Sequence, residues 1–476
     1  MQFCRPGPNH SVLNITKSIN QHGTHAIKNL SQSALFRYLL MEKLQSIINK
    51  MHIKIKIEEW YAVILSFIYY FCILGAYYII RPMRDQLAAE VGSVQLPWFF
   101  ASTLIATMLL TPLFGWLVSR WPRRVVMPFV YLFFIGCQLI FIPFFNDKTL
   151  VSPRTFGIIF FVWVSVFNLF AVSVFWSFMT DIWNDTQARR LFPIIALGGT
   201  FGAVIGPIIT NSLVESIGLA LLLGLSAGLL TVAVVCVVFL GKWAHQHGVH
   251  RHDAGNESAI GGGMLDGLRQ IFANPFIGKM SLIMLLSDAI GTIAYVLVTD
   301  YSGTTFPNDA IAQTRFAATM DLYANIIQVL VQLTITRWLL VRYGAGVVFA
   351  ICAAIVVFAC LTMTLINNPY ALIIGAMPGV ALLLIITRSL SHGMVQPARE
   401  TLYTLVSRDL RYKGKNAVDT VVWRAGDLLS TLSMNGFRSL GVTVGGFGVI
   451  WAALAATSGW IAFRLANRAE RGDFDI

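Results

Sequence analysis

Ionisable and polar side chains interrupt several apolar stretches of this sequence, and they recur every three or four residues. Residues at that interval share one face of an α-helix. The stretches carry Ser66, Tyr70, Tyr77, Arg81, Arg84 and Asp85; Asp288; Asp321, Asn325, Gln328 and Gln332; Arg388, His392 and Gln396; and Arg424, Asp427 and Thr431. Because charged groups are costly in apolar surroundings, such residues usually line a water-filled cavity. The alternative for any one stripe is an ion pair or hydrogen bond that only holds neighbouring helices together.

The basic residues indicate what such a cavity would bind. A guanidinium group presents paired planar donors that match a carboxylate or a phosphate. We therefore expect an anionic or zwitterionic small molecule to bind to Arg81, Arg84, Arg388 and Arg424, with Asp85 beside them.

The acidic residues would neutralise these cations or carry a proton, and they are Asp288, Asp321 and Asp427. Spacing alone leaves open whether Asp427 pairs with Arg424 on its own helix or with Arg388 on another. His392 is the histidine that falls within an apolar stretch. It is either a pH-responsive group or a neutral hydrogen-bond donor.

The sequence lacks the motifs that several classes of enzyme and metal-binding protein require. The sequence has no phosphate loop of the Gly-x-x-x-x-Gly-Lys-Ser/Thr type, and the apolar stretches hold no zinc-binding pair, paired catalytic carboxylates or Ser/His arrangement. The six cysteines have no metal-ligand spacing, and we interpret the histidines at 245–252 as part of a solvated segment. We expect no enzyme, no catalytic residue, no cofactor and no metal site.

The polar stripes must be positioned by long helices, because 56% of the 476 residues are hydrophobic and only 12% are charged. Apolar runs of about 20 residues are long enough to cross a bilayer. We predict an all-α polytopic membrane protein with about twelve spans, at 58–80, 96–119, 125–146, 155–180, 191–212, 217–241, 276–299, 316–341, 345–367, 370–396, 416–438 and 443–465.

The short connectors alternate between Lys/Arg-rich and Lys/Arg-poor, which predicts that both termini are cytoplasmic. This rule accounts for most of the net charge of +12, so nucleic-acid binding need not be invoked. We expect a monomer in the cell inner membrane, with a tail at 1–57, six-helix bundles at 58–241 and 276–466, a central loop at 242–275 and a second tail at 467–476. We also expect Met41 or Met51, rather than Met1, to be the native start.

Two similar halves of six spans are typical of carriers that work by alternating access, in which the bundles rock about a site near the midplane. The connector after the second span, with Gly115, Arg120 and Arg124, resembles the loop motif of the major facilitator superfamily. With Asp181 as a partner, it is our candidate cytoplasmic gate.

Several runs together resemble the ATP:ADP antiporter family of intracellular bacteria and plastids and its bacterial relatives. They are Tyr77 to Asp85, Phe175 to Asp181, Gln187 to Pro193, Gly198 to Gly202, Pro397 to Tyr403 and Arg411 to Asp427. The resemblance covers about 58–440 and implies a fold similar to that of the major facilitator superfamily.

The resemblance implies nucleotide exchange, with a basic residue at the position of Arg84 serving phosphate binding. Nucleotide-exchanging members commonly have a Lys at the position of Asp427, and an acidic residue late in the seventh span is replaced here by the run from Tyr295. A proton-coupled carrier of another organic anion or amphipathic compound is therefore the alternative. A scaffold or receptor that transports nothing would have little use for so many aligned charges.

Overall fold

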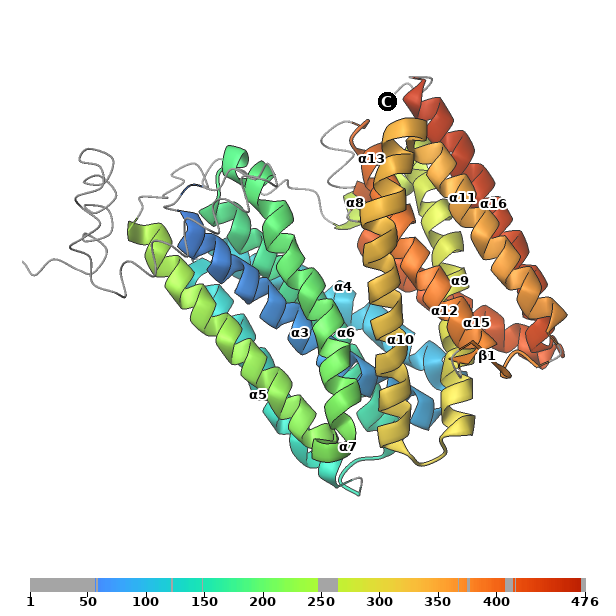
Figure 1. The fold of residues 1–476 in the computed structure, drawn as a ribbon, viewed down its shortest axis with the longest axis horizontal. Coiled ribbons are helices and arrows are strands. Elements are labelled where there is room, and N and C mark those ends of the chain that lie inside the picture. Colours follow the sequence, from blue (N-terminus) through green and yellow to red (C-terminus); the bar gives the residue numbers. More distant parts are fainter. Residues whose placement is uncertain are drawn as a thin grey trace, which may run out of the picture.

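The computed structural model describes residues 56, 59–120, 123–147, 149–246, 264–366, 368–374, 377–406, 414–415 and 417–471, and leaves out the side chains of 114–125, 185, 189, 264–268 and 374. The described chain is almost entirely helical. Its helices form two groups that lean apart toward one end of the molecule (Figure 1).

The first bundle contains long helices joined by short turns. They are α3 (Trp60–Val91), α4 (Leu96–Arg120), α5 (Arg123–Asn146), α6 (Pro153–Ile182) and α7 (Asp185–Gln246), with the 3₁₀ turn η4 (Ser93–Gln95) after α3. At 62 residues, α7 is far too long for one crossing of a bilayer. It turns back at Gly218, where φ is 73°, a conformation that is readily open only to glycine.

The second bundle repeats this plan with more interruptions. Its elements are α8 (Met264–Ala273), α9 (Pro275–Thr305), α10 (Ala310–Val331), η6 (Gln332–Thr336), α11 (Arg337–Leu365), β1 (Leu372–Ile374), β2 (Met377–Pro378), α12 (Gly379–Leu390), η7 (Ser391–Val395), α13 (Gln396–Tyr403), η8 (Val418–Val422), α15 (Trp423–Ser439) and α16 (Val444–Glu470). The elements η6, η7 and η8 are π-helical segments. Gly344, with φ at 80°, turns α11 back as Gly218 turns α7.

Each of the twelve predicted spans overlaps a helix. Among the described residues, nine helical stretches are long and apolar enough to cross a membrane, and two of these are the double-length stretches that turn at Gly218 and Gly344. The span at 416–438 corresponds to η8 and α15 and is not among the nine, because its polar stripe lowers its hydropathy. The prediction of an all-α polytopic protein is confirmed.

Several predicted span boundaries differ from the helix ends, those of the first and tenth spans among them. The first helix does not end near residue 80 but continues to Val91, so Arg81, Arg84 and Asp85 lie inside it. Their charges neutralise one another or pair with neighbouring helices, which removes the cost that made position 81 look like a helix end. The tenth span begins at Gly379 rather than 370, because 372–378 form the antiparallel hairpin of β1 and β2.

Two clusters of buried apolar side chains form the core. One joins α3 to α5, α6 and α7. The other joins α9 to α10, α11, α12, α15 and α16 and also takes in Leu96, Phe99 and Phe100 of α4, so it crosses between the bundles. Hydrogen bonds between the bundles lie toward the end of the molecule that carries β1, which we call the β1 end. They include Gln86 to Gln313 at 3.4 Å, Asn211 to Thr319 at 2.9 Å and Arg438 to Ser93 at 2.9 Å. The opposite end carries α8, α13 and the end of α16, and we call it the α13 end (Figure 1).

Glycines bring α3 and α7 into direct backbone contact. A Cβ atom built at Gly202 would lie 2.5 Å from the carbonyl oxygen of Phe71 and 2.8 Å from the backbone nitrogen of Gly75. At Gly198 it would lie 2.3 Å from the carbonyl oxygen of Phe67. Small residues at four-residue spacing allow this approach, and α3 is thereby held where its arginines face the second bundle.

We predict that Gly202→Val will destabilise the first bundle, because the added methyl groups must push two helix backbones apart. Overpacking typically costs about 1–3 kcal/mol, and the nearest atoms here are backbone atoms that cannot rotate away. Gly228→Val is the matched control, since nothing lies within 4 Å of a Cβ built at Gly228 of the same helix. Thermal unfolding of the purified variants in detergent checks this, and equal melting temperatures for the two would contradict it.

Candidate functional site

A cavity of about 600 Å³ lies between the two bundles, a volume within the range of small-molecule sites. Helices α3, α4, α6 and α7 line one side, and α9, α10, α12, α13 and α15 contribute to the other. Its charged lining residues are Arg81, Arg84, Asp288, Arg388, Arg399, Asp419, Arg424 and Asp427, with His392 among them. The cavity extends toward the α13 end, where Arg399 and Asp419 lie, and the inter-bundle hydrogen bonds close the β1 end.

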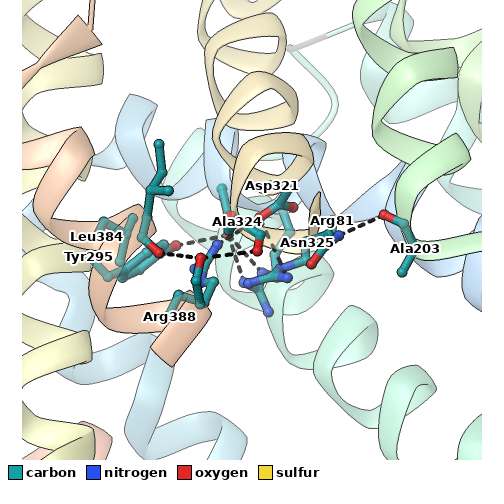
Figure 2. Close-up of polar contacts among 12 residues, drawn as sticks. Arg81, Ala203, Tyr295, Asp321, Ala324, Asn325, Leu384 and Arg388 are labelled. Atoms are coloured by element: carbon teal, nitrogen blue, oxygen red, sulfur yellow. Dashed lines mark hydrogen bonds and ion pairs between the residues drawn. The ribbon is translucent and has the colours of Figure 1, made fainter. Parts of the chain in front are cut away.

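Two arginines from different bundles meet at one carboxylate (Figure 2). Arg388 Nη1 on α12 donates a hydrogen bond of 2.6 Å to Asp321 Oδ1 on α10. Arg81 Nη1 on α3 lies 3.5 Å from the same oxygen. The side chain of Asp321 is 1% exposed, whereas those of Arg81 and Arg388 are 12% and 16% exposed and face the cavity. We call these three residues the Asp321 triad.

Arg84 and Asp85 form a separate pair beside the triad. Arg84 donates to Asp85 Oδ1 through Nε at 3.0 Å and Nη2 at 2.7 Å. Across the bundle interface, the Tyr295 hydroxyl donates to the same oxygen at 3.0 Å. The Arg84 guanidinium also stacks over Phe161, at 4.6 Å from the ring centroid. Asp85 does not line the cavity but lies behind its wall, in a small recess with Asp321.

The α15 stripe forms a second charged cluster, across the cavity on α9 and α15. Arg424 Nη1 lies 3.5 Å from Asp427 Oδ2 on its own helix, so the pairing that spacing left open is with Arg424 and not with Arg388. The Thr292 hydroxyl donates to Asp427 Oδ1 at 2.8 Å. Asp288 neighbours Asp427, and its Oδ2 has no hydrogen-bond partner among the described residues.

His392 faces the cavity with its ring 6.3 Å from that of Trp423. Its Nδ1 lies 3.1 Å from the side-chain oxygen of Gln396. A neutral imidazole with Nδ1 protonated, or an imidazolium, would donate this hydrogen bond. Both roles expected for the histidine are therefore compatible with its position.

Sequence reasoning missed Arg399 and Asp419. Arg399 Nη1 lies 2.8 Å from Asp419 Oδ1, and both residues line the cavity. The signal was available: Arg399 continues the stripe of Arg388, His392 and Gln396 at three-residue spacing, and the helix runs on through α13. The predicted span ends at 396, which places Arg399 three residues outside it.

Other predicted residues lie away from the cavity. Ser66 and Thr431 are buried against their own helices and donate to backbone carbonyl groups. Asp181 is on the last turn of α6 and does not line the cavity. The side chains of Gly115, Arg120 and Arg124 fall outside the described residues, although α4 ends at Arg120 and α5 begins at Arg123. The gate therefore stays a prediction.

The arrangement can bind an anion near the Asp321 triad. Two guanidinium groups meet one carboxylate there, which leaves one positive charge, and the neighbouring Arg84–Asp85 pair is neutral. Arg81 Nε has no hydrogen-bond partner among the described residues. This nitrogen is buried, so an anion in the cavity would contact the exposed parts of the two guanidinium groups, whose paired donors suit it.

Comparisons with known proteins agree with this architecture. The ADP,ATP carrier protein 2 of the chloroplast of Arabidopsis thaliana is 21% identical over 85% of this chain and 73% of its own. The solved structure of the nucleoside transporter NupG superposes with a TM-score of 0.56 at 17% identity, covering 86% of this chain and 98% of NupG. The POT family transporter PepTSo superposes with a TM-score of 0.59 at 14% identity, covering 86% and 98%.

Both superpositions cover most of this chain and nearly all of the solved structures. The sequence profile described as Major Facilitator Superfamily matches residues 62–415, from the start of α3 to beyond the end of α13. The chain is therefore a membrane transporter that belongs to the Major Facilitator Superfamily.

Proposed function

We propose that this chain is a secondary-active carrier of a small organic anion that works by alternating access in the cell inner membrane. The observation that carries the proposal is the convergence of Arg81 and Arg388, one from each bundle, on a single carboxylate. An anion held by both arginines would contact both moving bodies at once. Binding and movement are then linked, as alternating access requires.

The carboxylate of Asp321 supports an anion as the ligand class. It demonstrates that the two guanidinium groups lie close enough together to share one oxyanion, since both reach Asp321 Oδ1. A carboxylate or phosphate in the adjoining cavity would meet the exposed parts of the Arg81 and Arg388 side chains, which are 12% and 16% exposed. Paired guanidinium groups bind such planar or tetrahedral anions well.

Within this class, exchange of ATP and ADP is our first candidate. The similarity to chloroplast ADP,ATP carriers supports it. Aromatic rings also line the cavity near the arginines, among them Tyr70, Tyr77 and Tyr78, and adenine rings stack on such side chains. Exchange would follow if the empty carrier cannot reorient until its arginines are paired with an anion.

The second candidate is a proton-coupled carrier of another organic anion, and Asp288 favours it. This carboxylate neighbours Asp427 in the cavity wall. Arg424 lies 3.5 Å from Asp427, whereas no ion pair involving Asp288 occurs within the described part of the chain. Two adjacent carboxylates that share one cation can share a proton as well.

We predict that Arg81→Gln and Arg388→Gln will each lower uptake of labelled ADP into ADP-loaded proteoliposomes by at least about tenfold. Loss of a hydrogen bond to a charged group costs about 1.5–3 kcal/mol, and tenfold corresponds to about 1.4 kcal/mol. Arg464→Gln is the control, because Arg464 stacks on the exposed ring of Trp460, away from the cavity. Uptake by both cavity variants at the rate of the control would refute the proposed role.

We predict that exchange will require nucleotide inside the vesicles and will proceed at the same rate with and without an imposed pH gradient. The reason is that an exchanger needs no coupling ion. Uptake into empty vesicles that follows the pH gradient, and that Asp288→Asn makes insensitive to pH, would instead establish the proton-coupled alternative. The measurement is the initial rate of labelled ADP uptake at two internal pH values.

A further inference from the structure

We infer that Asp321 sets the net charge of the anion that this carrier accepts. The inference rests on the anion-binding role proposed above for Arg81 and Arg388. It concerns a different property, because a site can bind anions without discriminating among their charges.

The position of Asp321 is the first observation. Its carboxylate is 1% exposed and lies behind the two arginines as seen from the cavity, which Arg81 and Arg388 line and Asp321 does not. Asp321 Oδ1 accepts the hydrogen bond from Arg388 and forms an ion pair with Arg81. A ligand in the cavity would therefore contact the two arginines and not Asp321. The buried carboxylate would lower the positive electrostatic potential that the arginines create in the cavity.

The triad also carries a net charge that its own contacts do not cancel. Asp321 Oδ2 and Arg81 Nε are both buried and lack a hydrogen-bond partner among the described residues. Two cations and one carboxylate leave a single positive charge. In an apolar interior such a residual charge is costly unless it is matched, so the site is suited to one further anionic charge on the face that opens to the cavity.

The other carboxylate in the recess, Asp85, already has a cationic partner of its own. Arg84 is neutralised by Asp85, which also accepts from Tyr295. The amide of Asn325, one turn beyond Asp321, donates to the carbonyl group of Ala203 at 2.6 Å. Asp321 is therefore the carboxylate that contacts both Arg81 and Arg388, and it offsets part of the positive charge that they present. Neutralising it would present two charges and favour more highly charged anions.

Orthophosphate, pyrophosphate and tripolyphosphate form a series of increasing charge that tests this directly. We expect Asp321→Asn to raise the ratio of the dissociation constant for orthophosphate to that for tripolyphosphate at least about tenfold over wild type, a change of about 1.4 kcal/mol. The constants are measured by titration calorimetry on the full-length carrier in detergent. Ionic strength is held fixed, because salt screens charges.

Asp309→Asn is the matched control. Asp309 caps the same helix, α10, by accepting from the backbone of Ala312 at 2.9 Å, and asparagine caps helices as well as aspartate does. It lies twelve residues before Asp321 in the sequence, or about 18 Å along the helix. We expect this variant to keep the wild-type ratio.

Arg388→Gln tests the same inference in the opposite direction, should Asp321→Asn fold poorly. One arginine and one carboxylate then remain, and the ratio should fall at least about tenfold. The double variant Asp321→Asn with Arg388→Gln restores a single positive charge and should return the ratio toward that of wild type.

The outcomes separate this inference from the proposed function. Binding of all three anions by wild type, with a ratio in Asp321→Asn within about twofold of wild type, would overturn the inference and leave the anion site standing. An equal rise of the ratio in Asp309→Asn would also overturn it, because the net charge of the whole protein, rather than the position of Asp321, would then explain the change. Wild type that binds none of the three would overturn the proposed anion site and the inference together.

Discussion

A charged group inside an apolar protein must be matched by an opposite charge, and much of this structure follows from that constraint. Arg81, Arg388 and Asp321 come from three helices, and each would be costly there alone. Their mutual attraction joins α3 of the first bundle to α10 and α12 of the second. The glycines of α7 complete the arrangement, since they let α3 approach closely enough to place Arg81 at the interface.

The same constraint explains how a cavity with many charges can persist. Arg84 pairs with Asp85, Arg399 with Asp419 and Arg424 with Asp427, so most of the wall is close to neutral. Among the described residues of the wall, two charges are not cancelled by an ion pair. They are the residual positive charge of the Asp321 triad and the carboxylate of Asp288. An anion bound at the triad, or a proton bound at Asp288, would therefore change the electrostatic energy most. The hydrogen bonds between the bundles at the β1 end lie close to the triad.

Much of the fold could be predicted from the sequence, because span length, apolar runs and three-to-four-residue stripes are local properties. The turn at Gly344 lies between two predicted spans, the turn at Gly218 lies one residue inside the span predicted from 217, and the stripes on α3, α10 and α12 reach the cavity. What could not be predicted is which charges pair across helices. Hydropathy ended the first span at Arg81, since a local measure cannot register the Asp321 that neutralises it 240 residues later. Arg399 was missed as a site residue for the same reason, because hydropathy cannot register the Asp419 that pairs with it.

The central claim is that an anion binds between Arg81 and Arg388 and so contacts both bundles. A structure of the carrier determined with saturating ADP tests it most directly. Our account predicts density for a phosphate group within hydrogen-bond distance of both guanidinium groups, with Asp321 still behind them. Phosphate density elsewhere in the cavity, with both arginines still held only by Asp321, would contradict it.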